Sequence, residues 1–145
     1  MVKVILVGVL VIIVNLFFQA FGNILWLRKI VASFVDKSKK LTNRRILYLL
    51  TTSFIFLTIL HALHALVWAV CYYSLPKAAN DFSSFSDAIY FSVVTFTTLG
   101  YGDITLSSGW RLLSGIEAIN GIMLIGWSTA MMYSLIQRIY KNLND

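Results

Sequence analysis

The sequence predicts an all-α integral membrane protein with three transmembrane helices, on the basis of its composition and of three long apolar stretches. Of its 145 residues, 59% are hydrophobic and only 12% are charged, whereas soluble domains carry about 25% charged residues. The stretches 4–27, 46–76 and 112–137 hold almost no charge. Each exceeds the roughly 20 residues that a helix needs to cross a bilayer. A single cysteine, Cys71, excludes an intrachain disulfide framework.

The first stretch, within residues 1–27, predicts a retained N-terminal transmembrane helix. The apolar run after Lys3 is longer than the roughly 7–15 residues of a signal-peptide core, and no small-x-small cleavage site follows it.

The charge pattern predicts the orientation of the chain. Residues 28–45 hold one acid, Asp36, and many basic residues, and short basic loops stay on the cytoplasmic side. We therefore expect a multi-pass protein of the cell (inner or plasma) membrane, with the N-terminus outside and the C-terminus in the cytoplasm, although Lys3 opposes this. Apolar residues within 30–35 share a helix face, which is typical of a short interfacial helix; a plain solvated connector is the alternative. The basic residues are Arg28, Lys29, Lys37, Lys39, Lys40, Arg44 and Arg45.

The segment between the second and third spans carries the most specific pattern. Ser84 and Asp87 have the spacing of a helix cap, and about ten apolar or hydroxyl-bearing residues follow, which predicts a short re-entrant helix. The run T-T-L-G-Y-G-D then occupies residues 97–103.

This run resembles the T-V-G-Y-G-D pore loop of the potassium channel family, with Leu99 in place of Val. The resemblance covers residues 85 to about 140. It implies a small prokaryotic-type pore module at 46–145, with an outer helix at 46–76, a pore helix and filter at 84–103 and an inner helix at 111–140. The first span has no counterpart in the minimal two-helix module and is therefore an extra helix.

In such a channel, a ring of backbone carbonyls replaces the water around a K⁺ ion. Several carbonyls can face one side only if some residues take left-handed angles, which Gly100 and Gly102 adopt without a Cβ clash. One loop per chain implies a homotetramer, because a closed ring needs identical strands around an axis. Asp103 is expected at the filter mouth. The residues expected to bind K⁺ are Thr98, Leu99, Gly100, Tyr101 and Gly102.

The third span is interpreted by the same resemblance. Gly121 and Gly126 match inner-helix glycines, with Gly121 at the hinge; small residues that let helices approach closely are an equal alternative. Residues four apart share a helix face, which predicts a pore-lining surface, although Tyr133 is also typical of a membrane-interface aromatic. The expected cavity and gate residues are Ile122, Ile125, Thr129, Tyr133 and Gln137.

Ionisable residues inside the spans are functional candidates. His64 and Glu117 lie at similar depth at about 1.5 Å per residue, so a contact between outer and inner helices is geometrically allowed. The alternative is that each bonds a local group and joins its neighbouring helices. His61 shares the face of His64.

The surroundings of Asp103 depart from the family pattern. Many members brace this aspartate with a Glu or a Trp of the pore helix, and the corresponding residues here are Val94 and Phe91, which cannot hydrogen-bond. We therefore expect Asp103 to lack its usual partner, with Tyr90 as a candidate member of an aromatic cuff.

The resemblance implies a potassium-selective channel that carries passive K⁺ flux. A weakly selective monovalent cation channel and a non-conducting subunit or adaptor are the alternatives. The expected partners are K⁺ ions, the lipid bilayer and further copies of the chain, with no cofactor and no metal other than K⁺ in the filter. The ionisable residues form no nucleophile-base or metal-ligand set, so no enzyme is expected. The net charge of +6 reflects membrane topology rather than nucleic-acid binding.

Overall fold

The computed structural model describes residues 1–35, 42–107 and 109–144, and every regular element in these ranges is a helix. The helices are α1 (Val2–Val35), α2 (Asn43–Ser74), α3 (Pro76–Ala79), α4 (Phe85–Phe96) and α5 (Arg111–Asn144).

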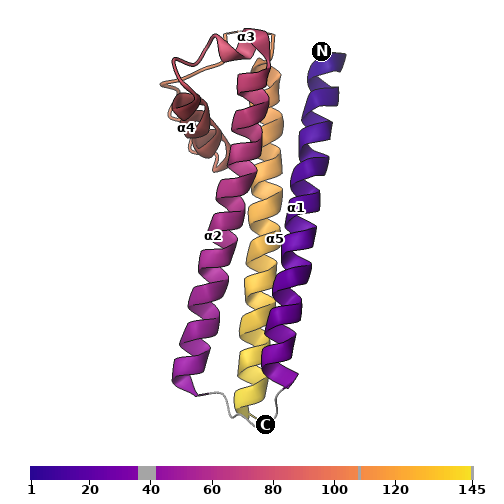
Figure 1. Ribbon diagram of the computed structural model, residues 1–145, viewed down its shortest axis with the longest axis vertical. Coiled ribbons are helices and arrows are strands. Elements are labelled where there is room, and N and C mark those ends of the chain that lie inside the picture. The colour runs from indigo at the N-terminus through magenta and orange to yellow at the C-terminus, as the bar shows by residue number, and fades with distance from the viewer. Residues whose placement is uncertain (36–41, 108, 145) are drawn as a thin grey trace.

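Three long helices, α1, α2 and α5, run side by side along the molecule (Figure 1). Each is long and apolar enough to cross a bilayer, which confirms the predicted all-α membrane fold with three spans. The N-terminus and α3 lie at one end of the bundle, and the C-terminus and the start of α2 lie at the other (Figure 1). We call the second end the basic end, because the described residues there include Arg28, Lys29, Arg44, Arg45, Arg138 and Lys141.

The predicted basic segment 28–45 is partly helical. Residues 28–35 continue α1 without a break, and α2 begins at Asn43. Residues 36–41, which hold part of the expected interfacial helix or connector, lie outside the described residues.

The short helix α4 is defined by a polar residue at each end. Ser84 precedes it and accepts a hydrogen bond from the Asp87 backbone N–H at 3.2 Å, which is the expected N-cap. After its last residue, the Thr97 hydroxyl donates to the Val93 carbonyl at 2.7 Å. Helix α4 packs against α2 and α5, where Phe91, Phe96 and neighbouring aromatic side chains form part of the core.

Gly121 lets α5 touch the backbone of α4. A Cβ at this position would lie 1.9 Å from the Phe96 carbonyl oxygen, while α5 continues as one helix through it. At Gly126, by contrast, a Cβ would meet no atom within 4 Å. Gly121 is therefore needed for the close approach of α4 and α5, and the hinge expected at the same position stays a prediction.

Helix α1 is joined to the other two spans by a row of buried polar side chains. Asn15 donates to Asn120 Oδ1 at 3.0 Å, and Gln19 donates to Ser128 Oγ at 3.1 Å. One and two turns further along, Asn23 is buried and the Trp26 indole donates to a serine of α2. Lipid tails are as apolar as Leu, so polar bonds of this kind, together with close packing, hold membrane helices together.

The Gly121 contact predicts a position-specific effect of added volume. Gly121→Ala forces the Cβ into the Phe96 carbonyl, and overpacking of this kind costs about 1–3 kcal/mol. Thermal unfolding of purified protein in detergent should therefore show a lower melting temperature for Gly121→Ala. Gly126→Ala is the matched control and should unfold close to the unmodified chain. Equal melting temperatures for both variants would contradict the contact.

Candidate functional site

The loop after α4 has alternating backbone handedness. Thr98, Gly100 and Gly102 have φ angles of 60°, 56° and 78°, whereas Leu99 and Tyr101 between them are not in the positive-φ region. Alternation of this kind turns successive carbonyls toward one side of a strand and the N–H groups toward the other. The two glycines were predicted to adopt these angles, and Thr98 adds a third position that composition alone did not indicate.

The loop is anchored to the end of α4. The backbone N–H groups of Leu99 and Gly100 both donate to the Val94 carbonyl, at 2.9 and 3.3 Å. These bonds fix where the chain leaves α4. Within a single chain, residues 97–103 are otherwise exposed, and the side chains of Leu99 and Tyr101 are 59% and 67% exposed.

Asp103 has a hydrogen-bond partner in place of the usual Glu or Trp, whose positions hold Val94 and Phe91. The Tyr90 hydroxyl on α4 donates to Asp103 Oδ2 at 2.8 Å. This hydrogen bond to the carboxylate raises the pKa of Tyr90, because loss of the phenol proton would place two negative groups together. Tyr90 thus takes over the bracing that Val94 and Phe91 cannot provide.

Behind the loop, the Glu117 carboxylate connects three helices. Its Oε2 accepts from the Tyr72 hydroxyl of α2, and its Oε1 accepts from the Ser92 hydroxyl of α4, each at 2.7 Å. All three residues are fully buried. Glu117 therefore fixes α4, and with it the loop, to both flanking spans.

The structure gives His64 and Glu117 separate partners, which agrees with the alternative that each bonds a local group and joins its neighbouring helices. Both ring nitrogens of His64 lie near amide oxygens of α1, at 3.3 Å from Asn15 Oδ1 and 3.0 Å from Gln19 Oε1. Residue counting along a helix gives depth but not the direction that a side chain faces. His64 faces α1, whereas Glu117 faces α2 and α4.

The five residues expected to line a cavity all lie on the exposed side of α5 in the single chain. Two local bonds order this surface, from Thr129 Oγ1 to the Ile125 carbonyl at 3.0 Å and from Gln137 Nε2 to Tyr133 Oη at 2.8 Å. Ile125, Thr129 and Tyr133 also line a cavity of about 490 Å³ between α2 and α5, into which His61 of α2 reaches.

Within the described ranges, no three His, Cys, Asp or Glu side chains gather in a way that could hold a metal ion. The groups available around residues 97–103 are backbone carbonyls, the hydroxyls of Thr97, Thr98 and Tyr101, and the Asp103 carboxylate.

The Glu117 contacts predict unequal effects at two adjacent tyrosines. Tyr72→Phe removes one donor and leaves a buried carboxylate oxygen unpaired, which costs about 1–3 kcal/mol. Tyr73→Phe is the matched control, because Tyr73 is half exposed and its packing on Phe85 involves only the ring. Thermal unfolding in detergent should show a clearly lower melting temperature for Tyr72→Phe and little change for Tyr73→Phe. A similar melting temperature for both variants would mean that the Glu117 carboxylate does not stabilise the contact among α2, α4 and α5.

A family model described as an ion channel matches residues 46–138. Two-pore potassium channel 4 of Arabidopsis thaliana is 32% identical over 81 residues, which are 53% of this chain and 28% of that protein. Two-pore potassium channel 1 of the same plant is 37% identical over 68 residues, 45% of this chain and 19% of its own length.

A third relative is the potassium voltage-gated channel protein Shal of Drosophila melanogaster, 28% identical over 88 residues, which are 59% of this chain and 15% of that protein. The chain thus spans less than a third of the length of each of these relatives. No solved structure matches the chain significantly. The relatives are channels and not enzymes, in line with the sequence. Because the ion channel model covers more than half of the residues, the chain belongs to the family of ion channels that this model describes.

Proposed function

We propose that four copies of the chain assemble around residues 97–103 and conduct K⁺ selectively and passively across the membrane. The observation that carries this proposal is the alternation of φ at Thr98, Gly100 and Gly102. It presents several carbonyl oxygens on one side of a strand, and a ring of such strands can replace the hydration shell of K⁺. A single strand cannot surround an ion, so the proposed site needs further copies of the chain.

The direction of α4 supports cation passage. Ser92 meets Glu117, and Phe96, four residues later, meets Gly121, so α4 runs in the same direction as α5. Its C-terminus therefore points from the α3 end toward the middle of the bundle. The C-terminus of a helix carries about half a negative charge, which favours a cation nearby.

Exposed apolar surface supports a closed assembly. A groove of about 400 Å³ lies between α4, the loop and α5, and Thr98, Asp103 and Arg111 are among the residues that line it. Leu99 and Tyr101 expose most of their side chains beside it. A neighbouring copy would cover this groove, and one strand per chain in a ring with cyclic symmetry gives a homotetramer.

The remaining assignments follow from this assembly. We place the basic end in the cytoplasm, by the positive-inside rule, and the N-terminus outside. The exposed face of α5 that holds Ile122, Ile125, Thr129, Tyr133 and Gln137 would line the inner cavity. Helix α5 would be free to bend at Gly126, which lies on the same exposed side.

Assembly can be tested directly by mass. Native mass spectrometry of the purified protein should give four copies of the 16.4 kDa chain. A mass of one or two copies, both in detergent and after release from lipid nanodiscs, would contradict the tetramer.

The filter assignment predicts the effect of one methyl group. The Cβ that Gly100→Ala adds would have no atom of the chain within 4 Å, so any effect of this substitution must come from the backbone φ of +56°. A left-handed φ costs an L-residue roughly 1–2 kcal/mol. Potassium flux into liposomes should fall by more than about tenfold, since each of four strands carries this cost. Gly109→Ala, which also meets open space and lacks a positive φ, should conduct normally. Selective K⁺ flux through Gly100→Ala would refute the assignment.

A further inference from the structure

A buried network of hydrogen bonds joins the three spans at His64. The two ring nitrogens of His64 lie 3.3 Å from Asn15 Oδ1 and 3.0 Å from Gln19 Oε1. Asn15 donates to Asn120 Oδ1 at 3.0 Å, and Gln19 donates to Ser128 Oγ at 3.1 Å. All five side chains are buried, so their polar atoms must find partners inside the protein. In such a network the direction of each hydrogen bond depends on the others.

Trp68 of α2 fixes one end of this network. Its indole N–H can only donate, and it donates to Asn120 Oδ1 at 3.1 Å. The Asn120 amide therefore cannot turn over, because its NH₂ group would then face the indole N–H. Asn15 must present its own NH₂ group to the same oxygen, which leaves Asn15 Oδ1 facing His64. An amide oxygen only accepts, so Nδ1 of His64 must carry a proton.

The other end of the network can take two arrangements, because the Ser128 hydroxyl can donate or accept. When Gln19 presents its oxygen to Nε2 of His64, this nitrogen also carries a proton and the ring is an imidazolium. When the Gln19 amide turns over, its NH₂ group donates to a bare Nε2, its oxygen accepts from the Ser128 hydroxyl, and the ring is neutral. Only the amide nitrogen and oxygen exchange places. The hydrogen bonds among these side chains are complete in both arrangements.

The charges around His64 come from the helices that pack against it. His61 of α2 has its ring centroid 6.1 Å from that of His64. Helix α5 carries Glu117, whose carboxylate is held by hydroxyls of α2 and α4, and α1 contributes uncharged amides. The ring of Phe96, the last residue of α4, stacks on His64 with centroids 6.1 Å apart. The negative C-terminus of α4 therefore lies on the side of His64 that faces away from α1.

The cavity of about 490 Å³ between α2 and α5 gives protons a route to this network. Ser128, at one end of the network, and His61 both line this cavity. A water needs about 10–15 Å³ of such volume and two to four polar partners, and hydroxyls of Thr58 and Thr129 also line the walls. Water in the cavity can therefore reach the Ser128 hydroxyl and exchange protons with the network.

We propose that His64 and the additional span α1 together form a buried proton-binding site. In the basic form the ring is neutral and its proton is on Nδ1. In the acidic form a proton from water has added to the lone pair of Nε2, while the Gln19 amide and the Ser128 hydroxyl have turned over. Both oxygens that accept from the charged ring belong to α1, and bonds from a charged donor are roughly twice as strong as neutral ones. Helix α1 thus supplies the groups that stabilise the bound proton.

Nitrogen NMR of labelled histidine tests the two forms directly. The full chain, with ¹⁵N only in its two histidines, is reconstituted into lipid nanodiscs, and the spectrum of His61→Gln assigns the His64 signals. Between about pH 9 and pH 3.5, a range that brackets the ordinary titration of histidine, Nδ1 should stay protonated and Nε2 should change from bare to protonated. A bare Nδ1 at any pH in this range, or an Nε2 that does not titrate, would overturn the proposal.

A matched pair of α1 variants tests the part that Gln19 plays. Gln19→Met keeps the length of the side chain but removes the amide, so the proton affinity of Nε2 should fall about tenfold, because the charged ring loses the stronger bond. Asn23→Leu is the control, since Asn23 lies one turn further along α1 and its buried amide has no hydrogen-bond partner among the described residues. It should change the affinity less than about twofold. Equal effects of the two variants would contradict the site.

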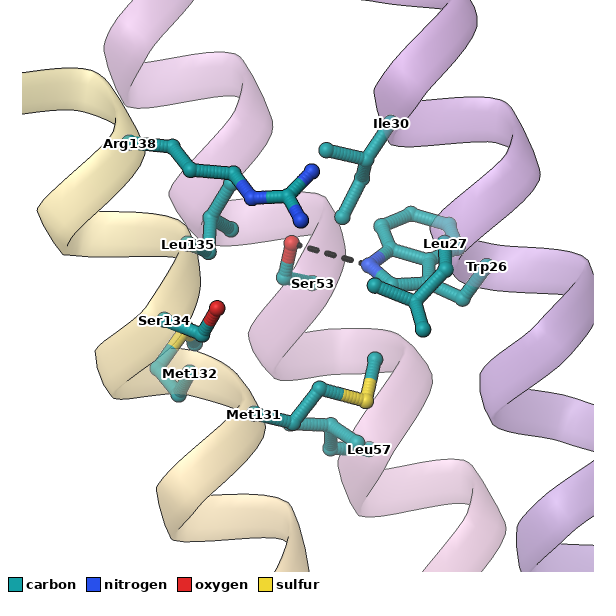
Figure 2. Close-up of a pocket in the computed structure, with 10 residues that line it drawn as sticks. All are labelled: Trp26, Leu27, Ile30, Ser53, Leu57, Met131, Met132, Ser134, Leu135 and Arg138. Carbon is teal, nitrogen blue, oxygen red and sulfur yellow. Dashed lines mark hydrogen bonds between the residues drawn. The ribbon is translucent and has the colours of Figure 1, made fainter.

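A matched pair of tryptophan variants tests the fixed end of the network. Trp68→Phe removes the donor that holds the Asn120 amide, so the neutral ring of His64 should then show protons on either nitrogen. Trp26→Phe is the control, because the Trp26 indole donates to Ser53 near the basic end and outside this network (Figure 2); it should keep the proton on Nδ1. A proton on Nδ1 alone in Trp68→Phe would contradict the assignment of the donor. If Trp68→Phe fails to fold, the Gln19 pair still decides, and none of these measurements needs an ion current.

Discussion

The structure depends on how a twelve-residue helix is held at a fixed position against two long ones. Glu117 and Gly121 lie one turn apart on α5, and they meet Ser92 and Phe96, which lie one turn apart on α4. The first contact is a hydrogen bond to a buried carboxylate and the second is direct contact of backbone with backbone. Because one is polar and the other steric, together they fix both the rotation of α4 and its distance from α5. The loop that follows α4 is held in place relative to it by the hydrogen bonds that Leu99 and Gly100 donate to the Val94 carbonyl.

Helix α1 is attached by a different kind of force. Hydrophobic burial gives little preference for protein over lipid inside a bilayer, and hydrogen bonds between helices contribute about 0.6 kcal/mol on average, with a maximum near 1.7. Asn15 and Gln19 each reach α5 and also lie next to His64 of α2. Trp68 of α2 donates to the same Asn120 oxygen as Asn15, at 3.1 Å. Several modest bonds thus connect the additional span to both spans of the pore module.

Sequence patterns predicted the elements well where a local rule decided the outcome. Span length and lack of charge gave three helices, and the absence of a Cβ gave positive φ at Gly100 and Gly102. The positive φ of Thr98 was not predicted, because the path of the loop imposes this left-handed angle and threonine has no preference for it. The partner of Asp103 was missed for a similar reason, since the return path of the loop brings it back to Tyr90.

The tertiary contacts between spans were harder to predict. Depth along the membrane suggested His64 and Glu117 as partners, but helix rotation turns them toward different neighbours. The signal that would have indicated the α1 contacts was present as Asn15, Gln19 and Asn23, spaced four residues apart within an apolar span. Polar residues at helical spacing inside a membrane segment mark the face that meets protein. Read in this way, the sequence indicates which side of α1 is buried.

The most direct test of the account is the ion preference of the unmodified protein. Purified protein is reconstituted into a planar bilayer with K⁺ on one side and Na⁺ on the other, and the reversal potential is measured. A carbonyl-lined filter predicts a reversal potential far from zero, negative on the K⁺ side as K⁺ leaves it, together with block by barium. A potential near zero, with cation current present, would mean that the loop does not select K⁺, and absence of current from correctly assembled protein would contradict the channel assignment itself.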